Sequence, residues 1–301
     1  MGLRIGFKTS PQAVDWSTLD ETWAAAGEQS IFDAGWLNDH LVDIVPDRGH
    51  ASYEALTLLA ALARKVPGKW VGHAVLSNTF RHPAVLAKAA TVLDHVTGGR
   101  FILGLGAGWL ETEHGPFGIA LPPIGERIDR LVSAVGVLEA LFAPEATSPP
   151  GVTRPDAFYP LDGAINQPPP ITPGGPPIYL GGQKRRGIEL AARSAAGWVM
   201  PGDRAGDVAY LGDRRDALMR AFEAIGRDPA GFAFVGQVVA GSSSADRREA
   251  LDAGRRFAKA GATEMIVGIT ASAGPDALLL AAREVAEPLA EATAALETAR
   301  R

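Results

Sequence analysis

The pair Asp39-His40 follows the apolar stretch Ile31–Leu37, in a segment that reads GWLNDHLV. An imidazole titrates near neutral pH, and a neighbouring carboxylate can fix its orientation, so the pair suits proton transfer or contact with the polar edge of a cofactor. An Asp-His pair that only caps the next segment is the structural alternative. Asn78 is a further small polar side chain after an apolar run, in HAVLSNTFRHP, whereas His73 and His82 in that segment fit structural positions.

The segment GRFILGLGAGW, residues 99–109, ends in alternate glycines after an apolar run. A dinucleotide-binding fold requires G-x-G-x-x-G opening directly into a helix. Trp109 occupies the third glycine position, and no helix is expected before about residue 125. Gly106 and Gly108 instead suit close approach of a ligand to free backbone N–H groups, which favour an anion. A plain tight turn is the structural alternative.

A second glycine pair, Gly181-Gly182, follows another apolar run in YLGGQKRRG, residues 179–187. Lys184 and Arg185 come next, in the first turn of an expected helix. Basic side chains there oppose the helix dipole at a cost of a few tenths of a kcal/mol each, roughly, and a bound phosphate or carboxylate would offset this cost. Solvated basic side chains that bind nothing are the alternative.

Other common site chemistries lack their motifs. The chain has no cysteine, which excludes disulfides, thiol nucleophiles and thiolate metal sites. Its histidines form neither H-E-x-x-H nor a His-x-His pair after the first strand, and no G-x-S-x-G turn is present. A redox cofactor bound through its phosphate is the specific chemistry that remains.

Short apolar runs alternate with helical periodicity along the chain. This alternation predicts eight strand–helix pairs and an α/β fold, the (β/α)8 TIM barrel, with an open doubly wound sheet as the alternative. In such a barrel the polar residues described above follow the carboxyl ends of strands, where ligands bind. The expected strands are 3–7, 31–39, 69–77, 100–106, 177–182, 197–200, 232–241 and 263–269, and the expected helices are 15–30, 52–64, 82–96, 125–142, 184–195, 206–225, 244–260 and one from 275.

The fourth helix should bury Ile128, Leu131, Val135 and Leu138, leaving Glu126, Arg127, Asp129 and Arg130 on its outer part. The Pro- and Gly-rich insertion Ala143–Pro177 that follows it has no long periodic pattern. It is expected to run over the surface as a loop and to cover part of the barrel mouth.

Composition limits the partners. With 301 residues, 47% of them hydrophobic, and a net charge of −5, the chain can bury a large core and has no basic tract. These features argue against nucleic acid or an anionic membrane as the main partner. The first residues lack a signal-peptide pattern, and no apolar run reaches the length of a membrane span, so a cytoplasmic location is expected.

Four segments together resemble the luciferase-like flavin and deazaflavin oxidoreductases, above all the branch that uses coenzyme F420: NDHL, residues 78–109, EHGPFGIALPPIGERIDRLVSAV and PIYLGGQKRRGIELAARSAAGW. The resemblance extends from Leu3 to about Ile269. It implies a single luciferase-like TIM-barrel domain over residues 1–301, with the insertion at about 143–177, and usually a homodimer.

The resemblance also implies the site. The deazaflavin ring would lie in the barrel mouth beside Asp39, His40 and Asn78, with His40 and Asp39 as the catalytic pair. A strained bulge, often a non-prolyl cis peptide, would support the ring from behind at Ala74–Val75. The remaining cofactor-binding residues would be Gly106, Ala107, Gly108 and Trp109 on one wall, Gly181, Gly182 and Gln183 on the other, and Lys184 and Arg185 near the acidic tail of F420.

One position departs from the sugar-phosphate dehydrogenases that the chain resembles. Those enzymes place a proton-donating glutamate directly after the glycine stretch, where this chain has Trp109, with Glu111 and Glu113 just beyond. Trp109 suggests a small, rather apolar organic substrate that exchanges a hydride with F420, and a wall packed against the cofactor is the other interpretation of this residue. The alternatives are an FMN-dependent monooxygenase that uses dioxygen and reduced flavin from a separate reductase, and a non-catalytic flavin-binding relative.

Overall fold

The computed structural model describes residues 2–44 and 51–300. Within them, parallel strands form one sheet in the order β3-β2-β1-β11-β10-β9-β8-β5, and pairing of β3 with β5 closes it into a barrel. The short β4 pairs with β5 beyond the end of β3, so β3 and β4 are two parts of one barrel strand. The barrel strands are β1 (Arg4–Thr9), β2 (Ala34–Leu37), β3 (Trp70–His73), β4 (Leu76–Ser77), β5 (Phe101–Gly106), β8 (Ile178–Leu180), β9 (Gly197–Val199), β10 (Ala233–Ala240) and β11 (Glu264–Ile269).

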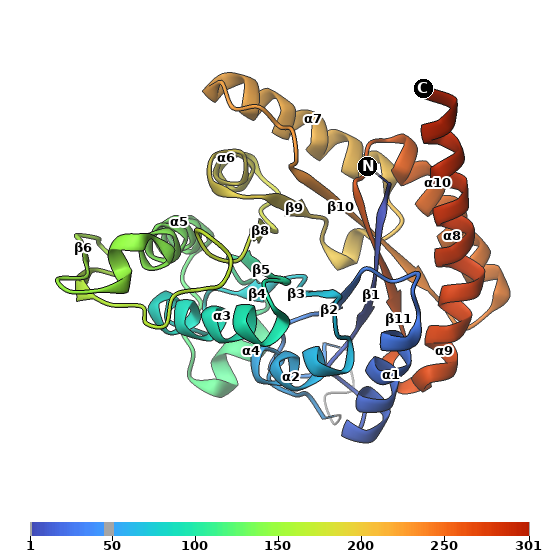
Figure 1. Cartoon of the computed structure of the whole chain (residues 1–301), viewed down its shortest axis with the longest axis horizontal. Helices are drawn as coiled ribbons and strands as arrows, with labels where there is room; N and C mark the ends of the chain where they lie inside the picture. Colours follow the sequence, from blue (N-terminus) through green and yellow to red (C-terminus); the bar gives the residue numbers. More distant parts are fainter. Residues whose placement is uncertain (1, 45–50, 301) are drawn as a thin grey trace.

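Helices surround the barrel, and the C-terminal helices lie beside α1 and α8 (Figure 1). The predicted (β/α)8 TIM barrel is confirmed, and an open sheet is excluded because the strands close. None of the helices in the described part of the chain is long and apolar enough to cross a membrane. The helices are α1 (Trp16–Glu28), α2 (Ala55–Leu62), α3 (Pro83–Thr97), α4 (Glu111–His114), α5 (Ile124–Phe142), α6 (Arg185–Ser194), α7 (Val208–Ile225), α8 (Ser244–Lys259), α9 (Gly274–Ala281) and α10 (Glu287–Arg300).

The structure corrects three local predictions. A short helix, α4, begins two residues after Trp109, where none was expected before about residue 125. The insertion is not all loop, because β6 (Val152–Arg154) and β7 (Leu161–Ala164) pair as an antiparallel hairpin, which projects from the barrel beyond α5 (Figure 1). The predicted strand 69–77 is divided into β3 and β4, at the place where the resemblance implied a bulge, and the cis peptide bond expected there between Ala74 and Val75 is confirmed.

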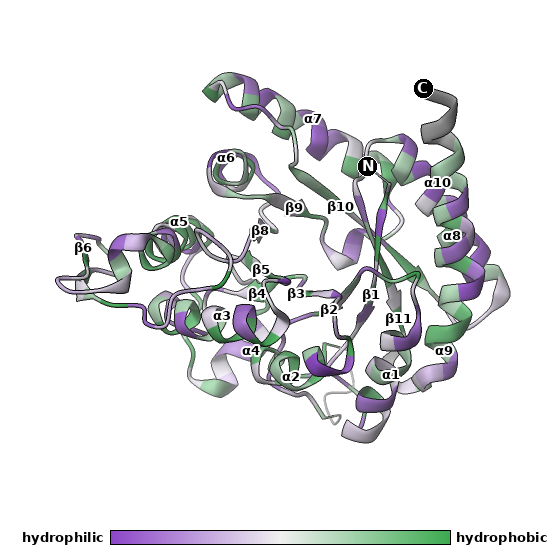
Figure 2. Cartoon of the chain, viewed as in Figure 1, coloured by the Kyte–Doolittle hydropathy of each residue, from purple (hydrophilic) through white to green (hydrophobic). Residues whose placement is uncertain are grey.

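The barrel interior is filled by side chains that alternate along the strands with those facing the helices. Trp36 is the largest residue of this inner layer and is almost completely buried. It fits because its neighbours are glycines: a Cβ atom on Gly6 would lie 2.6 Å from the Trp36 Nε1 atom, and one on Gly72 would lie 2.9 Å from Cζ3. Figure 2 shows the apolar residues along the central strands and the mixed faces of the surrounding helices.

His73, at the end of β3, is a core residue, as its place in an apolar run predicted. Its ring is fully buried and Nε2 lies 3.1 Å from the carbonyl oxygen of Ala55. Burial lowers the pKa of the imidazole from 6.5 to about 4. Between these values the unfolded chain binds more protons than the folded chain, so acid destabilises the fold.

We therefore expect the free energy of unfolding to fall by up to about 3 kcal/mol through His73 as pH drops from about 6.5 to about 4, with the full contribution present above that window. His73→Gln keeps a side-chain donor and removes this titration. Urea unfolding of both proteins at pH 7 and pH 4.5 should show a smaller difference for the variant. An equal pH dependence in both would mean that other groups cause the acid sensitivity.

Candidate active site

Two adjacent loops at the carboxyl end of the barrel present unpaired backbone amides. After β5, no described residue accepts a hydrogen bond from the N–H groups of Ala107, Gly108 and Trp109. After β8, the amides of Gly182 and Gln183 are likewise without acceptors, and α6 begins just beyond them. Since β5 pairs directly with β8, the two loops are neighbours. Such converging donors at a helix N-terminus suit a phosphate.

Gly108 shows why the first loop needs glycine. Its φ angle is +77°, and a Cβ atom there would lie 2.7 Å from both the Ser77 and the Thr79 hydroxyl oxygens. The amide-bearing backbone can therefore cross the end of β4 closely only without a side chain.

The Val75 side chain lies against Gly106 and Gly181, which have no side chains of their own. A Cβ atom on Gly106 would lie 2.9 Å from the Val75 Cγ2 atom, and one on Gly181 would lie 3.0 Å from it. Ala74 and Val75 are half-buried at the interruption between β3 and β4. The Val75 side chain thus lies between the two amide-bearing loops, as a surface against which a flat ligand can pack.

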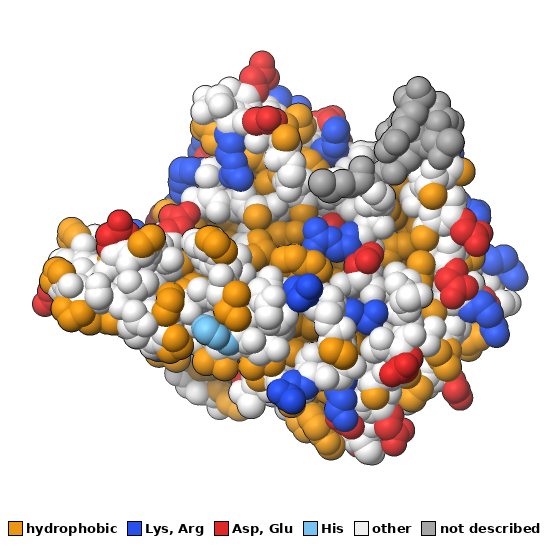
Figure 3. Space-filling view, in the orientation of Figure 1, with side chains coloured by type: hydrophobic (Ala, Val, Ile, Leu, Met, Phe, Trp, Pro, Cys, Tyr) orange, Lys and Arg blue, Asp and Glu red, His pale blue; other side chains and the backbone are white. Residues whose placement is uncertain are grey.

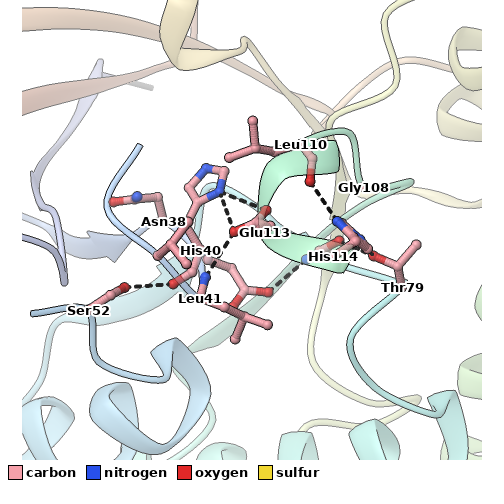
Figure 4. Close-up of polar contacts among 12 residues, drawn as sticks. Asn38, His40, Leu41, Ser52, Thr79, Gly108, Leu110, Glu113 and His114 are labelled. Carbon is pink, nitrogen blue, oxygen red and sulfur yellow. Dashed lines mark hydrogen bonds and ion pairs between the residues drawn. The ribbon is translucent and has the colours of Figure 1, made fainter. Parts of the chain in front are cut away.

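His40 is held by Glu113 across 73 positions of the chain (Figure 4). Its Nδ1 atom lies 3.1 Å and 3.2 Å from the two oxygens of the Glu113 carboxylate, which also accepts from the Leu41 amide at 2.9 Å. The Glu113 side chain is 2% exposed and that of His40 12%. No described residue bonds to Nε2, which Figure 4 shows on the side of the ring away from Glu113.

The short helix α4 places Glu113 beside His40. Its next residue, His114, is buried and bonds through Nε2 to the Thr79 hydroxyl at 2.7 Å and through Nδ1 to the Leu110 carbonyl at 2.7 Å. Glu111 is exposed on the opposite part of the turn. Of the two glutamates after the glycine stretch, only Glu113 therefore reaches His40.

Trp109 lies next to His40, and 65% of its surface is exposed. Its ring meets the His40 ring edge to face, with 5.8 Å between centroids and 88° between planes. An exposed aromatic ring beside a free imidazole nitrogen forms an apolar wall for a ligand that contacts Nε2.

Asp39 lies next to His40 in sequence but its carboxylate is already paired. Arg81 donates to its two oxygens at 2.6 Å and 2.9 Å, and the Ser77 amide donates at 2.8 Å. Arg81 also binds Glu54. Asp39 therefore ties the end of β4 to the loop after β2, and Asp39 and His40 have separate partners.

Asn78 and Arg127 line a cleft of about 150 Å³ beside the first amide-bearing loop, together with Arg130 and Tyr159. The Asn78 Oδ1 and Arg127 Nε atoms are buried with no hydrogen-bond partner among the described residues. Arg127 also donates to the Gly108 carbonyl. The prediction that Arg127 lies on the outer part of its helix is wrong, because it sits in the first turn of α5, where its long side chain folds back to this loop. Ile128, expected on the buried stripe, is only half-buried.

The basic residues after the second loop point to solvent. Lys184 caps α6 without a side-chain hydrogen bond, and Arg185 pairs with Glu189 one turn along the same helix at 3.2 Å. Arg186 binds Asp129 of α5. The Gln183 side chain accepts from the Tyr210 hydroxyl, which fixes the loop while leaving its amides free.

Residues 9–300 match the model of the family described as luciferase-like monooxygenase. The chain is 32% identical over 226 residues to an F420-dependent glucose-6-phosphate dehydrogenase of Nakamurella multipartita, a match that covers 75% of this chain and 63% of that protein. The chain thus spans less than two thirds of that relative.

Two further similarities extend the comparison. A phthiodiolone/phenolphthiodiolone dimycocerosates ketoreductase of Mycobacterium bovis is 28% identical over 280 residues, covering 83% of this chain and 69% of that protein. Among solved structures, an F420-dependent secondary alcohol dehydrogenase in complex with an F420-acetone adduct has a TM-score of 0.80 at 18% identity, covering 96% of this chain and 99% of that one. This structural likeness concerns the fold.

Proposed function

The chain belongs to the luciferase-like monooxygenase family, and from this premise we propose that it transfers a hydride between coenzyme F420 and a small organic substrate in the barrel mouth. The names of its relatives support F420 over FMN, since the dehydrogenase and the alcohol dehydrogenase compared above are both called F420-dependent. F420, when bound, supplies the carbon that accepts or donates the hydride.

The residues present fit such a cofactor. The free amides of Ala107, Gly108, Trp109, Gly182 and Gln183 suit its phosphate, and the unpartnered Asn78 oxygen and Arg127 nitrogen beside them offer further polar contacts. In this proposal the ring packs on Ala74 and Val75, with Gly106 and Gly181 giving it room. Lys184 and Arg185, at the exposed start of α6, meet the acidic tail, and Asp39 positions the end of β4 next to the ring.

The observation that carries the proposal is the bond between His40 and Glu113. A carboxylate on Nδ1 keeps a proton there and directs Nε2 toward the ligand, so Nε2 can take the hydroxyl proton of an alcohol, or return it to a ketone, as the hydride moves. We propose alcohol–carbonyl interconversion as the reaction, in keeping with the names of the ketoreductase and the alcohol dehydrogenase. Trp109 favours a substrate with an apolar portion.

The chain is further proposed to act as one domain and as a homodimer. Val85, Val92 and Val96 on α3 are 66%, 57% and 41% exposed and lie along one face of the helix, which a second copy would cover. Figure 3 shows apolar side chains gathered over the lobe that carries α3 and α5 in Figure 1. A separate reductase would supply reduced FMN if FMN is the cofactor, or reduced F420 if the reaction runs from ketone to alcohol.

Calorimetric titration of the purified protein with F420 and with FMN tests the cofactor. We expect saturable binding of F420, at least tenfold tighter than FMN, followed by loss of the F420 absorbance band when a small secondary alcohol is added. Tight binding of FMN without F420 binding would support the flavin monooxygenase instead. Binding of F420 with no change of its spectrum by any alcohol or ketone, in either redox state, would contradict catalysis by the His40–Glu113 pair.

A further inference from the structure

Lys8 is a half-buried basic residue near the carboxyl end of strand β1, and the other cation of this strand, Arg4, lies at the opposite end. Side chains alternate along β1, and Phe7 packs against Trp23 of α1 on the helix side, with 4.9 Å between the ring centroids. Lys8 therefore faces inward with Gly6, which borders Trp36. It is the last inward-facing residue of β1, paired in register with Trp36 of β2 and Gly268 of β11, so it lies at the carboxyl end of the barrel.

The Lys8 ammonium has one hydrogen-bond partner among the described residues and no carboxylate. Its Nζ atom donates to the Gln237 Oε1 atom of β10 at 2.5 Å, and the Gln237 amide in turn donates to the Met200 carbonyl. Two nearby positions carry no side chain: Cβ atoms on Gly202 and Gly268 would lie 3.6 Å from Nζ and 3.9 Å from Cε. Two ammonium protons of Lys8 thus remain for a ligand.

Partial burial of Lys8, with no counter-ion among the described residues, has an energetic consequence. It lowers the pKa of Lys8 from 10.5 to about 8, and no charged neighbour contributes to this shift. A cation that has lost part of its hydration is stabilised by an anion more than by a neutral oxygen. Gln237 offers a single amide oxygen and does not compensate the charge.

The place of Lys8 in the barrel puts it on the substrate side of the mouth. β1 adjoins β2, which leads to His40, and lies across the closed sheet from β5 and β8 with their amide-bearing loops. In a deazaflavin the hydride-bearing carbon lies across the central ring from the nitrogen that bears the ribityl chain. A tail held at β5 and β8 therefore leaves that carbon facing the wall formed by β1 and β2.

We propose that Lys8 binds a carboxylate of the substrate, so that the substrate is a small alcohol or ketone that also carries a carboxylate. The inference rests on the proposed function for its account of where the substrate lies. Nε2 of His40 meets the reacting oxygen, Trp109 covers the apolar part, and Lys8 anchors the acid group on the opposite side.

Binding of benzoate and of its uncharged analogue benzamide tests this assignment, by titration of the F420-loaded and the cofactor-free protein at pH 7. The wild type is expected to bind benzoate at least tenfold more tightly than benzamide. Lys8→Met should remove this preference, since methionine keeps an unbranched side chain, shorter by one atom, without the charge. Lys259→Met, at an exposed site at the end of α8, should leave the preference intact.

Equal binding of both compounds by the wild type overturns the proposal whether or not the variant folds, and so does an unchanged preference in Lys8→Met. Failure of the proposed function gives a different result, because the protein would then not bind F420. The titration of the cofactor-free protein would still show whether Lys8 causes a preference for benzoate over benzamide. A preference that appears only with F420 bound supports the proposal and shows that the ring completes the site.

Discussion

Replacing His40 with alanine is expected to lower kcat for F420-dependent alcohol oxidation by about 10²–10⁴-fold, the usual contribution of a positioned acid–base group. Affinity for F420 should be retained, because the proposed tail contacts come from the loops after β5 and β8. Stopped-flow measurement of F420 absorbance gives the hydride-transfer rate, and fluorescence titration gives the affinity in the same samples.

Glu113→Gln is the matched variant for this experiment. An amide at that position can still accept from the Leu41 amide, but it no longer supplies the negative charge that holds a proton on Nδ1 of His40. The rate should fall less than in His40→Ala, because the imidazole that exchanges the proton is still present. If His40→Ala retains the wild-type rate, the proton passes through another group and the proposed mechanism is wrong.

The second large effect is expected from Gly104→Ala, in the middle of β5. A Cβ atom there would lie 1.8 Å from the carbonyl oxygen of His73, which is backbone and cannot move aside without parting β3 from β5. We expect a loss of at least about 4 kcal/mol in the free energy of unfolding, or no folded protein at all. Urea unfolding followed by far-UV circular dichroism measures the loss.

Gly125→Ala provides the control. Gly125 lies in the first turn of α5, and a Cβ atom there would meet nothing within 4 Å. Alanine is favoured over glycine in a helix by roughly 1 kcal/mol or less, so this variant should be as stable as the wild type or slightly more so. Wild-type stability in Gly104→Ala would show that β3 and β5 pack less closely than described here.

The barrel could be predicted from the sequence because each strand and helix carries its own local pattern. The apolar run 100–106 and the alanine-rich stretch 82–96 correspond to β5 and α3. The hairpin β6–β7 was not predicted because its strands are short and lie in a segment rich in proline and glycine. Neither strand therefore shows a recognisable alternation of apolar and polar residues.

The site was predicted less completely, because its contacts join distant parts of the chain. Asp39 and His40 were recognised as a pair, yet each bonds to a residue that no spacing rule connects with it, Arg81 in one case and Glu113 in the other. Sequence alone could not choose between Glu111 and Glu113, since the choice depends on the one-turn helix α4. Lys8 left no clear signal, because it follows the predicted strand 3–7, which already contains the cation Arg4.

Residues 107–114 contribute two features of the candidate site. The start of this loop presents backbone amides, and Glu113 lies near its end. Under the proposed function, these are the phosphate contacts and the partner of His40, so grafting a relative's version of this loop is expected to change F420 affinity and hydride-transfer rate together. Lys8 of β1 and Gln237 of β10 lie outside that loop. Redesign of substrate preference is consequently best begun at Lys8 and Gln237, where selectivity can be altered while the redox machinery is left alone.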